Sequence, residues 1–151
     1  MSLKDKIMAD LKTAMLAKDE VKVTVLRGLK SVILDAEVAQ NKRDTGLADS
    51  EIEKLIAKEV KKRKEAIEVY TANGRGELVE SENSEKDILE SYLPKQISES
   101  EITAKIDEVL GSLPDGEIAQ MGTVIGQVKM LVGNAADGAT IARLVKEKLK
   151  Q

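Results

Sequence analysis

The hydrophobic positions of this chain recur every three or four residues over most of its length. Between Leu3 and Met15 they follow the period of an α-helix, with Ser2 placed to cap that helix and Asp5 near its positive end. The same period returns over residues 21–42, 49–72, 77–93, 98–110, 121–132 and 139–150. The alternation typical of strands is absent from the sequence, so we predict an all-α protein.

The chain is expected to have two parts. Pro94 ends the fourth predicted helix, and Ser98 and Glu101 have the spacing of a capping box that opens the fifth. The pattern therefore predicts an N-terminal helical bundle of about four helices over residues 1–95 and a small three-helix tail over residues 96–151. A loop from Gly111 to Gly116 is expected before the last two helices.

The second predicted helix, residues 21–42, is apolar on two sides. Val23, Leu34 and Val38 surround Arg27 on one side, and the other side carries Val25, Leu26, Leu29, Val32, Ile33 and Ala36. A helix with two apolar faces needs two neighbours. We favour a central position in the bundle; the alternative is that one face is an interface for a partner.

The third predicted helix, residues 49–72, begins at Asp49 or Ser50, where Ser50 and Glu53 fit a capping box. Glu59 and Arg63 fall on its apolar line. Buried charges need partners, so a mutual ion pair is favoured, and the alternative is a recess in which Arg63 holds a phosphate or carboxylate. Another side of this helix has the densest basic tract of the chain, Lys54, Lys58, Lys61 and Lys62, with Lys64 further round.

The composition excludes many kinds of chemistry. The 151 residues contain no histidine, cysteine, tryptophan or phenylalanine and two tyrosines, which removes the usual metal ligands, thiol nucleophiles and base-stacking rings. We therefore expect no catalytic residue, no cofactor and no metal. No apolar run reaches the ~20 residues of a membrane span, and the start of the chain lacks the apolar region of a secretory signal. These features predict a cytoplasmic protein without membrane contact.

The net charge of −3 conceals an uneven distribution. Residues 1–75 carry 16 Lys or Arg and 13 Asp or Glu, which leaves 8 and 14 for residues 76–151. This difference can arise by chance among helical surfaces, or it can mark a basic half that meets an anion.

The tail contains two glycine patterns. Residues 133–140 resemble a phosphate-binding loop, but Ala139 stands where that loop has its lysine, so a nucleotide site is disfavoured. Gly122 and Gly126 have the spacing that allows a close helix crossing.

Four segments in the same order resemble the signatures of the YqeY (GatB/YqeY) family. They read VLRGLK at 25–30, KEVKKRKEAI at 58–67, ILESYLPKQI at 88–97 and MGTVIG at 121–126, and ADG at 136–138 adds to them. The resemblance implies an all-α bundle and a three-helix tail. It also implies similarity to the C-terminal region of the B subunit of the glutamine-dependent aspartyl/glutamyl-tRNA amidotransferase, which helps to hold the tRNA. The same module is found appended to some glutaminyl-tRNA synthetases.

The chain departs from this family in the tail. Between Gly122 and Gly138 the family commonly has several basic residues and a proline, whereas Lys129 alone is basic here; the places are taken by Thr123, Met130, Leu131, Gly133 and Ala135. We therefore assign binding to the N-terminal half.

The resulting hypothesis is a non-catalytic tRNA-binding accessory protein related to the amidotransferase. The residues expected to contact nucleic acid are Arg27, Lys30, Lys54, Lys58, Lys61, Lys62, Arg63 and Lys64. One alternative is a protein–protein adaptor that docks on the amidotransferase or on an aminoacyl-tRNA synthetase. Another is a carbon–nitrogen ligase with glutamine as amido-N-donor, as the family resemblance implies.

Overall fold

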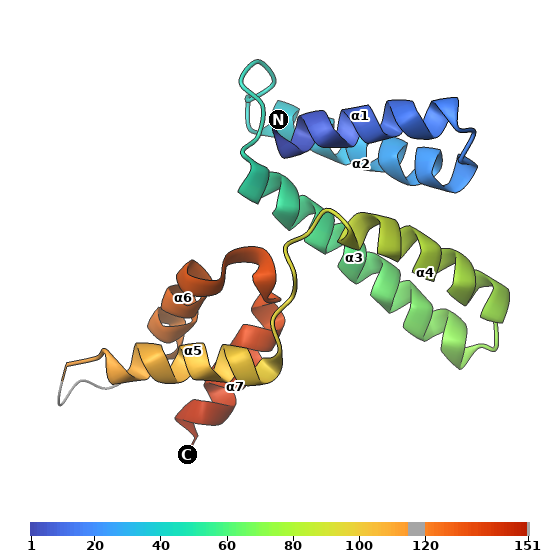
Figure 1. Ribbon diagram of the computed structural model, residues 1–151. Helices are drawn as coiled ribbons and strands as arrows, with labels where there is room; N and C mark the ends of the chain where they lie inside the picture. The colour runs from blue at the N-terminus through green and yellow to red at the C-terminus, as the bar shows by residue number, and fades with distance from the viewer. Residues whose placement is uncertain (115–119, 151) are drawn as a thin grey trace. The chain divides into compact units, whose positions relative to one another are not determined.

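A computed structural model describes residues 1–114 and 120–150. Over these ranges the chain forms seven α-helices, one short 3-10 helix and no strand, which confirms the all-α prediction (Figure 1). The chain divides between Leu93 and Pro94 into two compact units, two residues before the predicted boundary. That the two parts are separate domains stays a prediction. The predicted loop from Gly111 to Gly116 runs partly outside the described residues.

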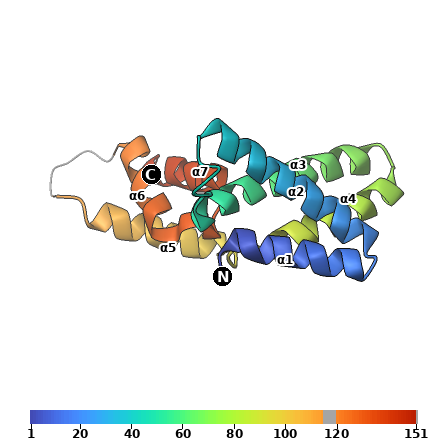
Figure 2. The ribbon, with the colours of Figure 1, turned by 90° about the horizontal axis from the view of Figure 1, so that it is seen from above.

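Unit 1 consists of two helical hairpins that pack on each other. The first pairs α1 (Leu3–Leu16) with α2 (Glu20–Ala39), and the second pairs α3 (Asp49–Ala72) with α4 (Gly76–Glu90). Within this unit, α1 and α2 lie over α3 and α4 when seen from above (Figure 2). Gly74 has a φ of 69° in the turn between α3 and α4, a conformation that glycine adopts without strain.

The first three helices begin differently from one another. Ser2 caps α1 as predicted, and the structure shows a reciprocal capping box between Ser2 and Asp5; Asp19 caps α2 through a 3.2 Å bond from the Lys22 amide. The predicted start of α3 at Asp49 is confirmed, but the capping box at Ser50 is wrong, because the N-cap is Ala48 and Ser50 lies within the first turn. The carboxylate of Asp49 accepts a 3.0 Å hydrogen bond from the backbone N–H of Leu3, so it satisfies an open donor of α1.

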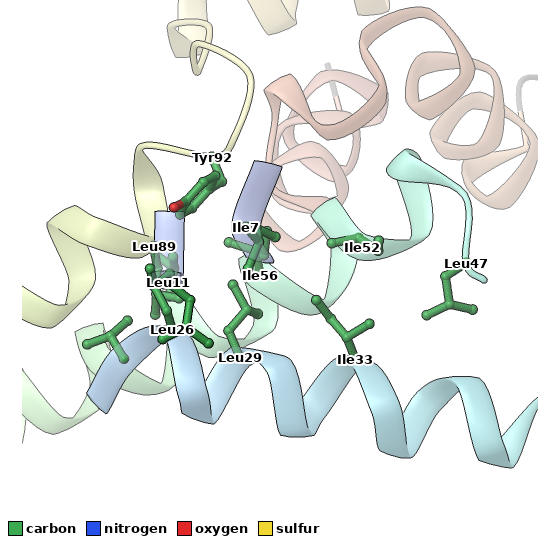
Figure 3. Packing of buried hydrophobic residues seen from close by; sticks show 12 residues of the cluster. Ile7, Leu11, Leu26, Leu29, Ile33, Leu47, Ile52, Ile56, Leu89 and Tyr92 are labelled. Atoms are coloured by element: carbon green, nitrogen blue, oxygen red, sulfur yellow. The ribbon is translucent and has the colours of Figure 1, made fainter. Parts of the chain in front are cut away.

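The core of unit 1 lies between the hairpins. Leu26, Leu29 and Ile33 line one side of α2 and point toward residues of α1 and α3 (Figure 3). Fully burying one such side chain stabilises the fold by about 1.5–3 kcal/mol. The buried cluster comprises Ile7, Leu11, Val25, Leu26, Leu29, Ile33, Leu47, Ile52, Ile56, Val60, Leu89 and Tyr92.

Three contacts of polar side chains join α1 to distant parts of unit 1. The Tyr92 hydroxyl donates a 2.6 Å hydrogen bond to the Asp10 carboxylate, and the Lys6 ammonium lies 5.6 Å from the centre of the same ring. Burial of the phenol is the main cause that raises the pKa of Tyr92, and the hydrogen bond to Asp10 raises it further. Glu37, which is 1% exposed, pairs at 2.9 Å with the ammonium of Lys4.

Unit 2 consists of α5 (Glu99–Gly111), α6 (Met121–Val132), the 3-10 helix η1 (Gly133–Ala135) and α7 (Gly138–Leu149). Ser98 caps α5 as predicted, accepting from the Glu101 amide at 3.1 Å. The segment before α5 is attached to η1, because Gln96 donates through Nε2 to the Asn134 carbonyl at 3.0 Å and the Ile97 amide to the Ala135 carbonyl at 2.9 Å. The core consists of Ile102, Ile106, Val109, Val124, Val128, Ile141, Leu144 and Val145.

Candidate nucleic-acid interface

One side of α3 presents a row of four exposed lysines, Lys54, Lys58, Lys61 and Lys62, which we call the lysine row. The opposite side of the helix buries Ile52, Ile56 and Val60. This division follows from the helical period, which places residues spaced by three and four on one side. Because each residue advances the helix by 1.5 Å, the row extends over about 12 Å.

Most of the lysine row has no counter-ion. Lys62 is held 3.2 Å from Glu59, one turn earlier, whereas Lys54, Lys58 and Lys61 form no ion pair within the described residues. Lys64, which lies outside the row, is 3.8 Å from Glu90 of α4. Three ammonium groups of the row are thus available to an external anion.

Arg63 is held by α4. Its Nε lies 3.2 Å from a Glu85 oxygen and 3.6 Å from a Glu82 oxygen, and its side chain is 30% exposed. The predicted ion pair between Glu59 and Arg63 is therefore wrong, since Glu59 pairs with Lys62. Two carboxylates already surround the guanidinium, so a recess that binds an external phosphate through Arg63 is disfavoured.

This arrangement leaves two polar atoms without hydrogen bonds. Arg63 Nε and Glu82 Oε2 are buried and have no hydrogen-bond partner among the described residues. The attraction between Arg63 and Glu82 is electrostatic. Although these two atoms are buried, the side chains as a whole are 30% and 19% exposed, so solvent screening weakens the attraction.

Arg27 and Lys30 do not join the lysine row. Both are exposed on α2, on the side of that helix that faces away from the shared core. Since α2 and α3 belong to hairpins that meet through this core, the two sets lie on different faces of unit 1. Arg27 borders a shallow hollow of about 400 Å³ at the turn between α1 and α2, lined also by Met15, Lys18, Glu20, Val23 and Thr24.

The second apolar side of α2 is only partly covered. Val23 packs against the core, but Leu34 is 36% exposed and Val38 59% exposed. The favoured prediction, that α2 is central with both faces covered, is therefore wrong for Leu34 and Val38. The alternative, an apolar side open to a partner, agrees with their exposure.

The close helix crossing predicted at Gly122 and Gly126 is wrong. A methyl group added at Gly122 or Gly126 would meet no heavy atom within 4 Å among the described residues, so these positions form no close helix crossing there. Asp137 caps α7 by accepting from the Thr140 amide at 3.3 Å. The glycine-rich segment thus serves as a helix start.

Two kinds of feature were sought in the described residues, a cluster of metal-ligating side chains and a membrane-spanning helix. No group of three or more acidic side chains in residues 1–114 and 120–150 is arranged to hold a metal ion. No helix in the same ranges is both long and apolar enough to cross a membrane. A ligase activity with glutamine as donor stays a prediction.

Comparison with known proteins identifies related sequences. The model of a family described as Yqey-like protein matches residues 4–149. A Kluyveromyces lactis protein is 34% identical over 149 residues, which cover 94% of this chain and 79% of that protein. A Lachancea thermotolerans protein is 40% identical over 106 residues, covering 69% and 56%, and a Saccharomyces cerevisiae protein is 32% identical over 127 residues, covering 84% and 66%.

All three relatives are named "Altered inheritance of mitochondria protein 41, mitochondrial". This name contradicts the predicted cytoplasmic localisation, which is therefore wrong. The prediction relied on the absence of long apolar segments, and that criterion detects membrane spans and secretory signals but not mitochondrial transit peptides, which are amphipathic. The chain spans little more than half of the Lachancea thermotolerans protein and about two thirds of the Saccharomyces cerevisiae one.

Proposed function

The chain belongs to the YqeY-like family, and from this premise we propose that it is a tRNA-binding accessory protein related to the glutamine-dependent tRNA amidotransferase. In this proposal the protein performs no chemistry itself. The lysine row contacts phosphates of the tRNA and fixes its position without reading the base sequence.

The observation that carries the proposal is the unpaired state of Lys54, Lys58 and Lys61. An exposed lysine already paired with a carboxylate gains less from a phosphate, because the phosphate must replace the existing partner. The three ammonium groups without partners are arranged on one rigid helix, where they can contact one anionic backbone together. Lys64 faces one carboxylate of α4 and is a secondary contact, whereas Arg63 is held by two carboxylates and is not expected to contact the RNA. Arg27 and Lys30, on another face, can at most contact a separate part of the RNA.

Binding of bulk tRNA at low salt, measured by fluorescence anisotropy, tests the proposal. The variant in which all four lysines of the row become glutamine should bind at least about tenfold more weakly, since it removes up to four phosphate contacts. Glutamine removes the charge and avoids the repulsion that new carboxylates would create along the helix. Circular dichroism should show the helix content of the unmodified chain.

A matched control changes four other exposed lysines, Lys12, Lys95, Lys146 and Lys150, to glutamine. This control has the same net charge as the row variant, so a purely long-range effect would weaken both equally. The proposal fails if the unmodified chain does not bind tRNA, or if the two variants lose the same affinity.

A second candidate function is a protein–protein adaptor, and the exposure of Leu34 and Val38 on α2 favours it. Replacing both with aspartate should leave the fold intact, because neither side chain is buried. The same change should abolish capture of the amidotransferase or of an aminoacyl-tRNA synthetase in a pull-down. Retained capture by the folded variant would exclude this face as the interface.

A further inference from the structure

We infer that the lysine row selects double-helical RNA, the paired stems of a tRNA, over unpaired strands. This inference rests on the proposed function and specifies the form of RNA that the row accepts. Three features of unit 1 lead to it: the lack of an aromatic ring beside the row, the fixed spacing of the row along α3, and the carboxylates beyond its C-terminal end.

No aromatic ring is available beside the row. The chain has two tyrosines, of which Tyr92 is buried and hydrogen-bonded to Asp10, and Tyr70 is half-buried on the core side of α3. Proteins that bind unpaired strands gain about 1–3 kcal/mol for each base stacked on a ring. An unpaired strand on the lysine row gains only its phosphate contacts, and these must compensate for the freedom that the strand loses.

The helix fixes the spacing of the row along its axis. Lys54, Lys58 and Lys62 follow one another at intervals of four residues, or about 6 Å along the axis of α3. A base-paired stem holds its phosphates in fixed positions before it binds, whereas an unpaired strand must be ordered against the helix. Pre-organised partners lose less conformational entropy on association, which favours the stem.

Carboxylates follow the row at its C-terminal end. Glu65 and Glu68 are exposed on the same side of α3, after the last lysine of the row. In α4, the antiparallel neighbour of α3, Glu77 and Glu80 are exposed near the same end of the hairpin, because they follow the turn at Gly74 by three and six residues. A flexible strand that follows the surface beyond the row would meet these negative groups. A stiff stem touches a convex surface over a short length, so it can contact the lysines and stay clear of the carboxylates.

A competition experiment tests this inference on the full chain. Fluorescent tRNA is bound first, and then displaced by unlabelled competitors: a blunt RNA duplex, or an oligouridine with the same number of phosphates. We expect the duplex to displace the tRNA at a concentration at least about tenfold lower than the oligouridine does. Binding of the duplex should fall with salt with a log–log slope no steeper than about −3 to −4, since four lysines release at most about four counter-ions.

The outcomes separate the two proposals. If the labelled tRNA does not bind, the proposed function fails before any competitor is added. If tRNA binds and oligouridine displaces it as well as the duplex does, the proposed function stands and the selection of stems is refuted. The selection is also refuted if neither competitor displaces the tRNA, because the protein then recognises the tertiary shape of the tRNA.

Discussion

Replacing Tyr92 with phenylalanine is expected to destabilise unit 1 while leaving its core packing unchanged. The substitution removes only the hydroxyl, which donates a 2.6 Å hydrogen bond to the Asp10 carboxylate; the ring stays buried. A hydrogen bond to a charged group contributes about 1.5–3 kcal/mol. Since Asp10 is half-exposed and regains water when the hydroxyl is lost, we expect a reduction of about 1–2 kcal/mol in the free energy of unfolding.

Because of the same bond, the stability of unit 1 should decrease as the pH rises in the alkaline range. Burial and the contact with Asp10 raise the pKa of Tyr92 above its ordinary value of about 10. The folded state therefore holds the phenolic proton more tightly than the unfolded state does. This contribution is complete below about pH 10 and is lost as the pH rises through the folded value, by at most about 1.4 kcal/mol per pH unit.

Urea unfolding followed by circular dichroism measures both effects. Between about pH 9 and about pH 11 the unmodified chain should lose about 1 kcal/mol more stability than Tyr92→Phe does. Lysines also titrate in this range, but they are present in both proteins and cancel in the difference. Hydrogen exchange at neutral pH should show weaker protection in α1 and α4 of the variant, with the amides of α5 and α7 as internal reference.

Tyr70→Phe is the matched control, since the Tyr70 hydroxyl forms no hydrogen bond within the described part of the chain. It should leave the pH dependence of the unmodified chain intact. Equal losses of stability at alkaline pH in the unmodified chain and in Tyr92→Phe would refute the assignment of this pH dependence to the bond with Asp10.

Three further predictions follow from the packing and the ion pairs. Lys4→Met leaves the buried Glu37 carboxylate without its cation. Because Lys4 is partly exposed, we expect the free energy of unfolding in urea to fall by about 2 kcal/mol, and adding Glu37→Gln should recover part of this loss. Leu26→Ala empties a fully buried position and should reduce the free energy of unfolding by about 2–5 kcal/mol, whereas Leu34→Ala on the exposed side of α2 should change it by less than about 0.5 kcal/mol in the same assay. Brief trypsin digestion should cut first after Lys95, which is exposed between Tyr92, bonded to Asp10 in unit 1, and Gln96, bonded to Asn134 in unit 2. Mass spectrometry identifies the first cut, and a first cut within α3 would contradict this prediction.

The buried sides of the helices could be predicted from residue spacing. Leu26, Leu29 and Ile33 recur at the helical period, and all three are buried. The exposure of Leu34 and Val38 could not be predicted in this way. Spacing shows which side chains share a face of a helix, but it does not show whether another helix covers that face.

The partners of charged residues were harder to predict than their positions. Arg63 lies on the core side of α3 as its spacing indicates, yet its carboxylate partners come from α4 and not from Glu59. The register of the hairpin decides this pairing. The sequence does contain an indication of the pairing between Arg63 and Glu85. Both residues are 11 positions from Gly74 in the turn, and antiparallel helices bring residues equally distant from a turn side by side. The lysine row was predicted as a basic tract, but which of its members lacks a carboxylate depends on side-chain contacts.

The contacts that hold α1 have a consequence for the order in which unit 1 folds during synthesis. Asp49, which caps α1, is 46 residues beyond Leu3, and Tyr92 is 82 residues beyond Asp10. At a synthesis rate of about 5–20 residues per second, Tyr92 is made about 4–16 s after Asp10. Until then α3 alone can cover the hairpin of α1 and α2, so part of the core around Leu11 stays accessible to chaperones or to other nascent chains.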